Sequence, residues 1–181
     1  MTLTDKRALR RAVREELAKL SHEDKRLFSA DIFDHIESLP QVKEASVVAL
    51  FASLDDEPQT EVIIERLSHH KRVVLPRIEG DEMEFYDLAS GALAEGAFGI
   101  MEPQSGELVE PRKIDVMVVP GVAFTPLGDR LGRGKGFYDR YLSREGFRAY
   151  CVGVCYPHQM VDELPVEPHD RRMDEVVSGN E

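Results

Sequence analysis

The sequence predicts an α/β protein in which helices cover the faces of a largely parallel β-sheet. Short apolar runs that are typical of strands alternate with helical stretches along most of the chain. In addition, the run Val116–Val119 is apolar at every position, as in strands that are buried on both faces of a parallel sheet. The chain has 181 residues, a length typical of one domain, so we expect residues 1–181 to form a single domain.

Two helices are expected at the beginning of the chain. Residues 4–20 carry apolar side chains at the spacing of a stripe that is buried on one face of a helix. This stripe consists of Leu9, Val13, Leu17 and Leu20. Ser21 resembles an N-cap followed by acidic residues, and it begins a second helix that extends to about Leu39, just before Pro40.

The first predicted helix also carries three basic residues on one flank. Lys6, Arg10 and Arg14 are spaced by four residues, which is close to one helical turn of ~3.6 residues. Their cationic groups can therefore converge on one anionic ligand. A charged run on a helix is also commonly a solvated face, and for this flank taken alone that alternative stays open.

The rest of the chain alternates between predicted strands and helices. Strands are expected at residues 46–52, 72–75, 83–86, 115–119 and 149–154, and helices at residues 60–69 and 136–144. Residues 88–111 contain repeated glycine and proline turn signals, so we expect an irregular loop there.

Charge and composition exclude several classes of protein. The net charge is −11, and a negative field opposes general association with nucleic acids or anionic membranes. No apolar run approaches the ~18 residues of a membrane span, and the charged first residues do not fit a secretory signal. Cys151 and Cys155 are the two cysteines, and they are expected to pack in a core strand rather than to form a disulfide framework or metal site. We therefore expect a cytoplasmic protein.

A glycine-rich loop between a predicted strand and a predicted helix carries the strongest functional signal. Gly132, Gly134 and Gly136 alternate with Arg133 and Lys135. Glycine lets backbone N–H groups approach phosphate oxygens, and the interleaved cations supply the charge that a triphosphate requires. The spacing fits neither a Walker A loop nor the G-x-G-x-x-G pattern. On spacing alone, a phosphate site and a flexible surface loop are equal alternatives.

Two runs around this loop, Val119–Phe124 and Gly128–Arg140, form one longer pattern. This pattern resembles the signature of 5-formyltetrahydrofolate cyclo-ligases, also called 5,10-methenyltetrahydrofolate synthetases. The resemblance continues in the same order through Lys6–Arg10, Phe51–Thr60, Lys71–Arg77, Gly99–Pro103 and Leu164–Val177. Chance does not readily explain so many ordered segments.

The resemblance implies a reaction and a more detailed fold. Members of this family convert 5-formyltetrahydrofolate and MgATP to 5,10-methenyltetrahydrofolate, ADP and phosphate. The family fold is a three-layer α/β sandwich of the NagB/RpiA/CoA transferase-like type, with a largely parallel sheet and helices on both faces. The implied partners are a reduced folate and ATP as co-substrate, with Mg²⁺ as cofactor. We expect a monomer that binds neither nucleic acid nor a membrane.

The resemblance also implies roles for individual residues. The implied ATP-binding residues are Lys6, Arg7, Ala8, Leu9, Arg10, Arg14, Arg130, Leu131, Gly132, Arg133, Gly134, Lys135, Gly136, Phe137 and Tyr138. The implied substrate contacts are Leu54, Glu57 and Gln59, together with Arg133, Gly134, Lys135, Gly136 and Phe137. Arg133, Lys135 and Tyr138 would be catalytic. Asp139 and Asp170 would bind magnesium, with Asp174 as an alternative to Asp170.

Two positions depart from the family pattern. Gln59 stands where the family commonly has an acid, and Thr125 replaces an aspartate that usually follows the phenylalanine of the signature. These departures leave the implied ATP site intact and bear on the efficiency and identity of the pterin substrate. Two other functions therefore stay open: a folate- or nucleotide-binding regulatory protein, and a small-molecule kinase on the same scaffold.

Overall fold

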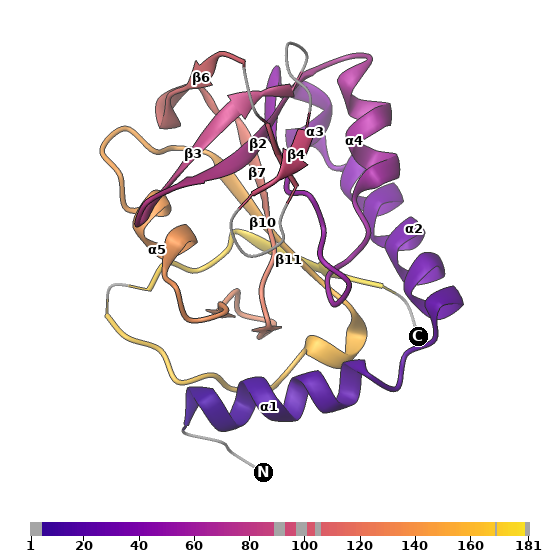
Figure 1. Ribbon diagram of the computed structural model, residues 1–181. Helices are drawn as coiled ribbons and strands as arrows, with labels where there is room; N and C mark the ends of the chain where they lie inside the picture. Colours follow the sequence, from indigo (N-terminus) through magenta and orange to yellow (C-terminus); the bar gives the residue numbers. More distant parts are fainter. Residues whose placement is uncertain (1–4, 89–92, 97–100, 104–105, 169, 180–181) are drawn as a thin grey trace.

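A seven-stranded sheet forms the centre of the molecule, in the order β11-β10-β7-β1-β2-β3-β6 (Figure 1). In this order, the strands are Glu175–Ser178, Tyr150–Cys155, Val116–Val119, Val47–Ala49, Arg72–Glu79, Glu82–Asp87 and Leu108–Val109. This computed structural model describes residues 5–88, 93–96, 101–103, 106–168 and 170–179.

Five neighbouring strands, from β11 to β2, run parallel, which confirms the predicted largely parallel sheet. In the central strand β1, Val48 is in register with Val73 of β2 and with Val116 of β7. β3 and β6 are antiparallel to their neighbours and complete one edge. Asp115 fixes the start of β1, because its carboxylate accepts a hydrogen bond from the N–H group of Val47 (2.9 Å).

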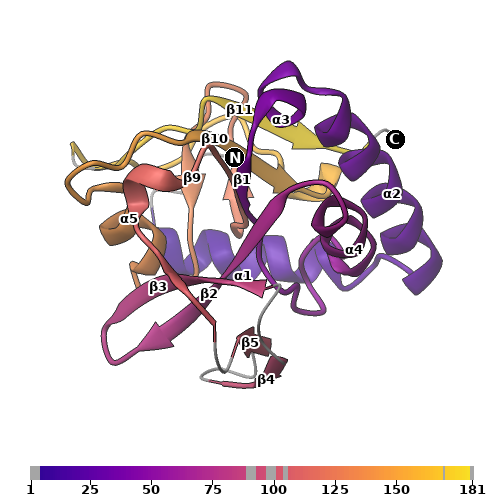
Figure 2. The same cartoon turned by 90° about the horizontal axis from the view of Figure 1, so that it is seen from above.

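Helices cover both faces of the sheet (Figure 2). α2 (His22–Ser38) and α4 (Glu61–Ser68) pack on one face, and α5 (Phe137–Leu142) packs on the other. Side chains alternate along each strand, so Val48 belongs to the core on the first face and Ala49 to the core on the second. The predicted α/β sandwich with helices on both faces is confirmed.

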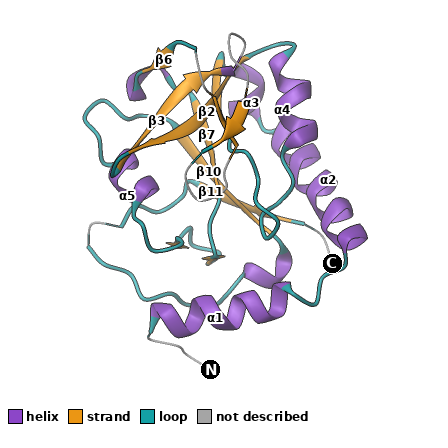
Figure 3. Cartoon of the chain, in the orientation of Figure 1, coloured by secondary structure: helices purple, strands orange, loops and turns teal. Residues whose placement is uncertain are grey.

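α1 (Lys6–Leu17) lies across one end of the sheet rather than on a face (Figure 3). Leu9, Val13 and Leu17 are buried, as the apolar stripe predicts. They form a third core with residues of the loops that leave β7 and β10. α1 therefore closes the carboxyl end of the parallel strands, which is where open α/β sheets bind ligands.

Most predicted elements are present, with ends that differ by a few residues. The helix predicted at 4–20 is α1, and residue 4 lies outside the described residues. Ser21 caps α2 as predicted, because its Oγ accepts a hydrogen bond from the N–H group of Asp24 (3.0 Å). The strand predicted at 72–75 extends to Glu79, since the hairpin with β3 continues its hydrogen bonding.

The irregular loop predicted over residues 88–111 was wrong in part. Within the described part of this segment, β4 (Leu93–Glu95) pairs with β5 (Met101–Pro103), and β6 pairs with β3. Residues 89–92, 97–100 and 104–105 lie outside the described residues. Strands of two or three residues depend on their pairing partners more than on their own sequence. The glycine and proline turn signals were therefore the stronger local pattern, and they predicted a loop.

Several other short elements were not predicted. They are α3 (Pro40–Glu44), the 3-10 helices η3 (Pro111–Lys113) and η4 (Pro157–Gln159), and the hairpin of β8 (Ala123–Phe124) and β9 (Arg130–Leu131). Each of the three short helices begins with a proline, a residue that suits the first helical position because its missing N–H has no partner there. β11 was also missed.

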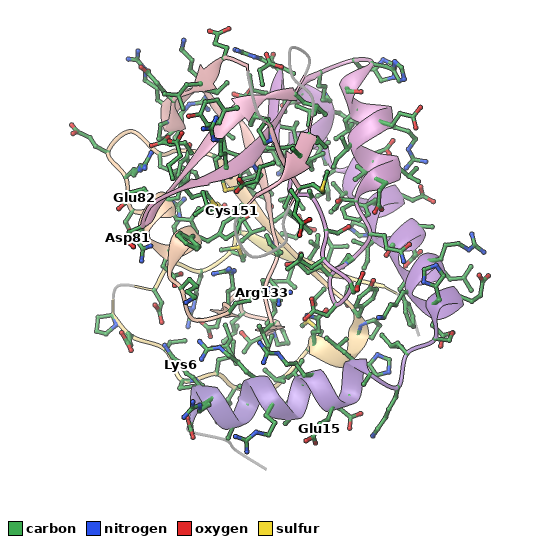
Figure 4. All side chains as sticks on the ribbon, viewed as in Figure 1. Lys6, Glu15, Asp81, Glu82, Arg133 and Cys151 are labelled. Atoms are coloured by element: carbon green, nitrogen blue, oxygen red, sulfur yellow. The ribbon has the colours of Figure 1, made fainter. Side chains whose placement is uncertain are left out.

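The two cysteines lie in β10, and the interior position of Cys151 is visible in Figure 4. Cys151 and Cys155 are buried free thiols, which confirms that they pack in the core. Burial raises the pKa of both thiols to about 12, so neither is a thiolate at neutral pH. No helix within the described residues is long and apolar enough to cross a membrane.

Candidate active site

A cavity of about 440 Å³ lies at the carboxyl ends of the central strands. Its walls include Phe51 and Ala52, which follow β1, and Pro120 and Gly121, which follow β7. The complete lining consists of Lys6, Arg10, Phe51, Ala52, Leu54, Glu57, Pro76, Ile78, Met83, Glu102, Pro120, Gly121, residues 130–139 and Asp170. The cavity thus joins α1, the loop after β1, the β2–β3 hairpin, β5 and the loop between β9 and α5.

The loop between β9 and α5, residues 132–136, forms one wall and is called here the glycine loop. Gly134 and Gly136 have φ angles of 108° and 74°, in the left-handed region that other residues rarely adopt. Arg10 of α1 donates from Nε to the carbonyl oxygen of Gly132 (2.8 Å). This contact brings together the two basic segments of the sequence, α1 and the glycine loop.

The cations of this wall are Lys6, Arg10, Arg130, Arg133 and Lys135, and Figure 4 shows Lys6 near the start of α1. Lys6 Nζ lies 3.6 Å from the Glu167 carboxylate. Arg130 is held in place because its Nε donates to the Pro120 carbonyl oxygen (2.7 Å) and its side chain is only 8% exposed. The wall therefore presents positive charge from several chain segments to one space.

Arg130, Tyr138 and Asp139 contact one another within this wall. The Arg130 guanidinium lies 5.1 Å from the centre of the Tyr138 ring and 3.6 Å from the Asp139 carboxylate. Burial lowers the pKa of Arg130 and raises the pKa of Tyr138. An arginine remains cationic in proteins, and the phenol of Tyr138 remains protonated, so both groups are hydrogen-bond donors at neutral pH.

The loop after β1, residues 51–60, forms the opposite wall, and it is called here the folate loop because the resemblance described above implies that it contacts the folate. Its Glu57 is only 6% exposed. Glu57 Oε1 accepts a hydrogen bond from the Leu54 N–H group (2.8 Å), and Oε2 lies 3.4 Å from the Arg133 guanidinium. Burial raises the pKa of the Glu57 carboxyl, while the Leu54 N–H and Arg133 act against that rise. Arg133 also contacts Asp56.

The folate loop is closed at its neck by two reciprocal hydrogen bonds. The Ser53 N–H donates to Thr60 Oγ1, and the Thr60 N–H donates to Ser53 Oγ, both at 3.1 Å. Thr60 lies directly before α4, so these two hydrogen bonds anchor the loop at the beginning of a helix. The conformation of residues 54–59 is therefore set by local polar contacts as well as by burial of Glu57.

The acids proposed for magnesium occupy different positions. Asp139 and Asp170 both line the cavity. Asp170 Oδ2 accepts a hydrogen bond from the Glu167 N–H group (2.8 Å). Asp174 does not line the cavity, and its carboxylate accepts a hydrogen bond from the Cys151 N–H group at the start of β10 (2.7 Å). Of the two alternatives, only Asp170 faces the same space as Asp139.

Some implied ATP-binding residues lie outside this cavity. Leu9 is buried in the core beneath α1, and Ala8 does not reach the lining. Arg7 and Arg14 line a separate, open groove of about 520 Å³ together with Arg11. Arg10 and Arg133 border both spaces. Adjacent residues of a helix point in different directions, which explains the positions of Arg7, Ala8 and Leu9. Arg14 shares the flank of Lys6 and Arg10 but lies about 6 Å farther along the helix axis than Arg10, so the predicted convergence holds for Lys6 and Arg10 alone of these three.

The two departures from the family pattern also lie outside the cavity lining. The backbone N–H of Gln59 donates to Ser29 Oγ (2.8 Å). Thr125 is 1% exposed, and its Oγ1 accepts a hydrogen bond from the Asp129 N–H group (3.1 Å) in the turn between β8 and β9. Thr125 therefore has a local structural role, and neither side chain belongs to the wall that would receive a pterin.

Several lining residues were not singled out from the sequence, among them Ile78, Met83 and Glu102. Glu102 is 4% exposed, and its carboxylate accepts a hydrogen bond from the Ile78 N–H group (2.7 Å). Glu102 follows Gly99 in a segment that carries the resemblance, which was the one available signal. Ile78 and Met83 could not be recognised as lining residues from the sequence, because apolar residues in strands usually pack in the core.

Comparisons with known proteins identify the family of this chain. The profile of the 5-formyltetrahydrofolate cyclo-ligase family matches residues 2–179. The chain is 29% identical to the 5-formyltetrahydrofolate cyclo-ligase of Mus musculus, over 95% of this chain and 92% of that protein. It is 31% identical to the Escherichia coli K12 protein of the same name, over 92% of this chain and 96% of that protein.

Solved structures of synthetases share the fold. The 5,10-methenyltetrahydrofolate synthetase of Aquifex aeolicus has a TM-score of 0.86 and 39% identity, covering 96% of this chain and 89% of that one. The synthetase from Mycoplasma pneumoniae has a TM-score of 0.78 and 28% identity, covering 96% of this chain and 98% of that one. The family profile includes every residue that lines the cavity. The chain therefore belongs to the 5-formyltetrahydrofolate cyclo-ligase family.

Proposed function

We propose that the cavity binds ATP against the glycine loop and a reduced folate against the folate loop, with ring closure between them. As a member of its family, the chain is an ATP-dependent ligase that converts 5-formyltetrahydrofolate to 5,10-methenyltetrahydrofolate, with release of ADP and phosphate. One observation carries the placement of the substrates: a cationic wall with left-handed glycines and a buried carboxylate face the same space.

The cationic wall suits the phosphates of ATP. Lys6, Arg10 and Lys135 present charge to the cavity, and the glycine loop has no Cβ atoms at three positions that would keep oxygens away from backbone N–H groups. Several phosphate oxygens must be held at once, and charge-assisted hydrogen bonds are the strong ones. Arg130 adds a further cation that its contact with Pro120 holds rigid.

The opposite wall suits a pterin ring. Ile78 and Met83 offer apolar surface for a flat ring. Glu57 offers carboxylate oxygens to the same cavity, and a pterin carries amino and amide N–H groups that need acceptors. Because Glu57 is largely removed from water, a hydrogen bond to it contributes strongly to affinity and orientation.

The chemistry explains why both substrates must share one space. A formamide carbonyl is a poor electrophile, and its oxygen is a poor leaving group. The formyl oxygen attacks the γ-phosphorus of ATP, so that an O–P bond forms and ADP is released. The formyl oxygen is then part of a phosphate group, which is a good leaving group. N10 of the folate then attacks the formyl carbon, loses its proton, and the phosphate departs. Arg10, Arg130 and Lys135 stabilise the charge on the transferring phosphoryl group.

Asp139 and Asp170 fit a magnesium ion. Mg²⁺ in phosphoryl-transfer sites takes one or two protein carboxylates and completes its shell with water and phosphate oxygens. Asp139 and Asp170 both line the cavity, so they can supply these carboxylates to an ion that is bound with ATP. When bound with ATP, the ion neutralises phosphate charge.

A spectrophotometric progress curve tests this proposal. Purified protein is mixed with 5-formyltetrahydrofolate and Mg²⁺, with and without ATP, and the absorbance of methenyltetrahydrofolate is followed. We expect product only with ATP. ADP formation without methenyl product would instead indicate a kinase, and folate binding without ATP hydrolysis would indicate a regulatory binding protein.

We also propose that the protein acts as a monomer in the cytoplasm, with small molecules as its partners. The net charge of −11 supports small molecules as partners, since it opposes binding to nucleic acids and anionic membranes. Light scattering at concentrations used in the assay should give the chain mass of 20.5 kDa. Twice that mass, with activity that depends on protein concentration, would contradict the proposed monomer.

A further inference from the structure

A set of buried polar side chains lies behind the cavity, outside its lining. Ser29 of α2 and Tyr156 and Gln159 at η4 are exposed by 4%, 0% and 1%. None of these three described residues lines the cavity. Buried polar groups destabilise a fold unless they are hydrogen-bonded, so their partners show what they hold in place.

Tyr156 and Ser29 hold the folate loop at two points. Tyr156 Oη donates to the carbonyl oxygen of Glu57 (2.9 Å), and the Gln59 N–H donates to Ser29 Oγ (2.8 Å). The two hydroxyl oxygens are 3.5 Å apart. Since the one phenol proton of Tyr156 goes to Glu57, the Ser29 proton points to Tyr156. The hydrogen bonds then run in one direction, from Gln59 through both hydroxyls to Glu57.

This chain of hydrogen bonds acts on the residue that carries the buried carboxylate. The backbone of Glu57 is fixed by Tyr156 from behind, while its side chain is fixed by the Leu54 N–H in front. Burial raises the pKa of Tyr156 to about 12, so its phenol stays a donor throughout the neutral range. The position of the Glu57 carboxylate thus depends on a tyrosine that does not face the cavity.

Gln159 holds the opposite side of the cavity from the same short helix. Its Nε2 donates to the carbonyl oxygens of Gly121 (2.9 Å) and Val122 (3.1 Å). Its Oε1 accepts a hydrogen bond from the Tyr156 N–H group (2.8 Å). The residue before Gly121 is Pro120, whose carbonyl oxygen accepts the hydrogen bond that orients Arg130.

We propose that Tyr156 and Gln159 are positioning residues, through which η4 sets both walls of the cavity. Tyr156 fixes Glu57 for the folate, and Gln159 fixes the turn that orients Arg130 for ATP. The inference rests on the proposed placement of the two substrates. Because Tyr156 directly precedes η4 and Gln159 is its last residue, their contacts also set the separation of the walls, and this separation aligns the formyl oxygen with the phosphate.

Two substitutions test the contact with the folate loop. Tyr156→Phe removes only the hydroxyl group of Tyr156, and Ser29→Ala removes the hydroxyl group of Ser29. Each should raise the KM for 5-formyltetrahydrofolate by about three- to tenfold, the range expected for loss of one buried neutral hydrogen bond. The KM for ATP should stay within about twofold of wild type.

Tyr141→Phe is the matched control. Tyr141 is 1% exposed, and its hydroxyl is buried without a hydrogen-bond partner among the described residues. Its removal should leave both KM values unchanged. If Tyr156→Phe behaves like this control, or lowers only the melting temperature, the positioning role is refuted.

Gln159→Met tests the other contact and should give the opposite pattern. Loss of two donors to Gly121 and Val122 should raise the KM for ATP by about tenfold and change the KM for folate less. Equal increases in both KM values for both Tyr156→Phe and Gln159→Met would indicate general loosening and would overturn the proposal. If Gln159→Met does not fold, Tyr156→Phe and Ser29→Ala decide the question.

Calorimetric titration with 5-formyltetrahydrofolate, without ATP, separates this inference from the proposed function. Wild type that binds folate but forms no methenyl product would contradict the proposed reaction, while weaker binding by Tyr156→Phe would still support the positioning role. Folate binding that is equal in wild type and Tyr156→Phe would overturn the role and leave the reaction intact. No folate binding by wild type would overturn both.

Discussion

The two walls of the cavity hold their charged groups in different ways. On the glycine-loop side, cations from α1, β9 and the loop itself converge, and Arg10 and Arg130 each donate to a backbone carbonyl oxygen. On the folate-loop side, one carboxylate is buried, accepts a backbone N–H bond and is supported from behind by Tyr156. The first wall spreads charge over several groups, and the second concentrates recognition in Glu57.

This difference matches the ligands that the walls would receive. Phosphate charge is shared by several oxygens, so several cations hold it together. A pterin edge presents few N–H groups, so its acceptor must be placed accurately. Arg133 connects the two sides: it belongs to the glycine loop, but its ion pairs are with Asp56 and Glu57 of the folate loop. Phosphate binding near Arg133 would therefore loosen its hold on Glu57.

The largest effect is expected from removing a cation of the glycine loop. Lys135→Ala should lower kcat/KM for ATP by about 10²–10³-fold, because a preorganised charge on the transferring phosphoryl group is lost. The melting temperature should not change, since Lys135 is exposed. Steady-state kinetics with varied ATP measure the effect. Lys113→Ala is the control, because Lys113 is exposed and outside the cavity. Unchanged ATP dependence in Lys135→Ala would contradict the role of this wall.

The next largest effect should come from the folate loop. Glu57→Gln should lower kcat/KM for 5-formyltetrahydrofolate by about 10–100-fold, the range for loss of hydrogen bonds to a charged group. The KM for ATP should stay within about twofold. Asp55→Asn removes a charge from an exposed residue of the same loop outside the lining, and it should have little effect. An equal loss in both variants would indicate that Glu57 acts only through net charge.

A smaller effect should distinguish the two candidate metal ligands. Asp170→Asn should raise the Mg²⁺ concentration for half-maximal activity by about tenfold, as is typical when one carboxylate near a metal loses its charge. Asp174→Asn should leave that concentration unchanged and lower the melting temperature, because Asp174 holds the Cys151 N–H group. Activity measured over a Mg²⁺ series would show the reverse pattern if Asp174 were the ligand.

Glu57→Gln should also stabilise the fold above the ordinary carboxyl pKa of 4.5. Burial raises the pKa of Glu57, so the folded state binds the proton more tightly than the unfolded chain does. Stability of the wild type therefore falls as pH rises from 4.5 through the folded pKa. The variant has no carboxyl group to titrate, so its melting temperature should exceed that of wild type at neutral pH. Thermal unfolding over a pH series that showed no such gain would contradict a cost of burying Glu57.

The sequence predicted the sheet and its main helices because these depend on repeating local patterns. The apolar run Val116–Val119 and the stripe on α1 are buried as expected. The short strands β4, β5 and β6 were missed because strands of two or three residues are too short to show a pattern of their own. The order of the strands and the position of α1 at the end of the sheet likewise depend on tertiary contacts.

The cavity was predictable where chemistry and backbone geometry both leave a trace in the sequence. Alternating glycines with Arg133 and Lys135 left a phosphate site and a surface loop as equal alternatives on spacing alone, and the structure places this loop at the cavity. Ile78 and Met83 could not be separated from ordinary core residues, since a ligand-binding apolar side chain looks like a packing one. Tyr156 was harder still to predict from the sequence, because it contacts the backbone of Glu57 and does not line the cavity itself.

The smallest expected effect is at Gln59, where the family commonly has an acid. The structure uses the backbone of this residue, whose N–H donates to Ser29 Oγ, and its side chain is not part of the lining. Gln59→Glu keeps that backbone contact, so the KM for 5-formyltetrahydrofolate should change by less than about twofold. Kinetics with varied folate check this, with Glu57→Gln as the sensitive reference on the same loop. A tenfold lower KM in Gln59→Glu would mean that a carboxylate at position 59 reaches the folate, and recognition on this wall would then be shared between two side chains rather than concentrated in Glu57.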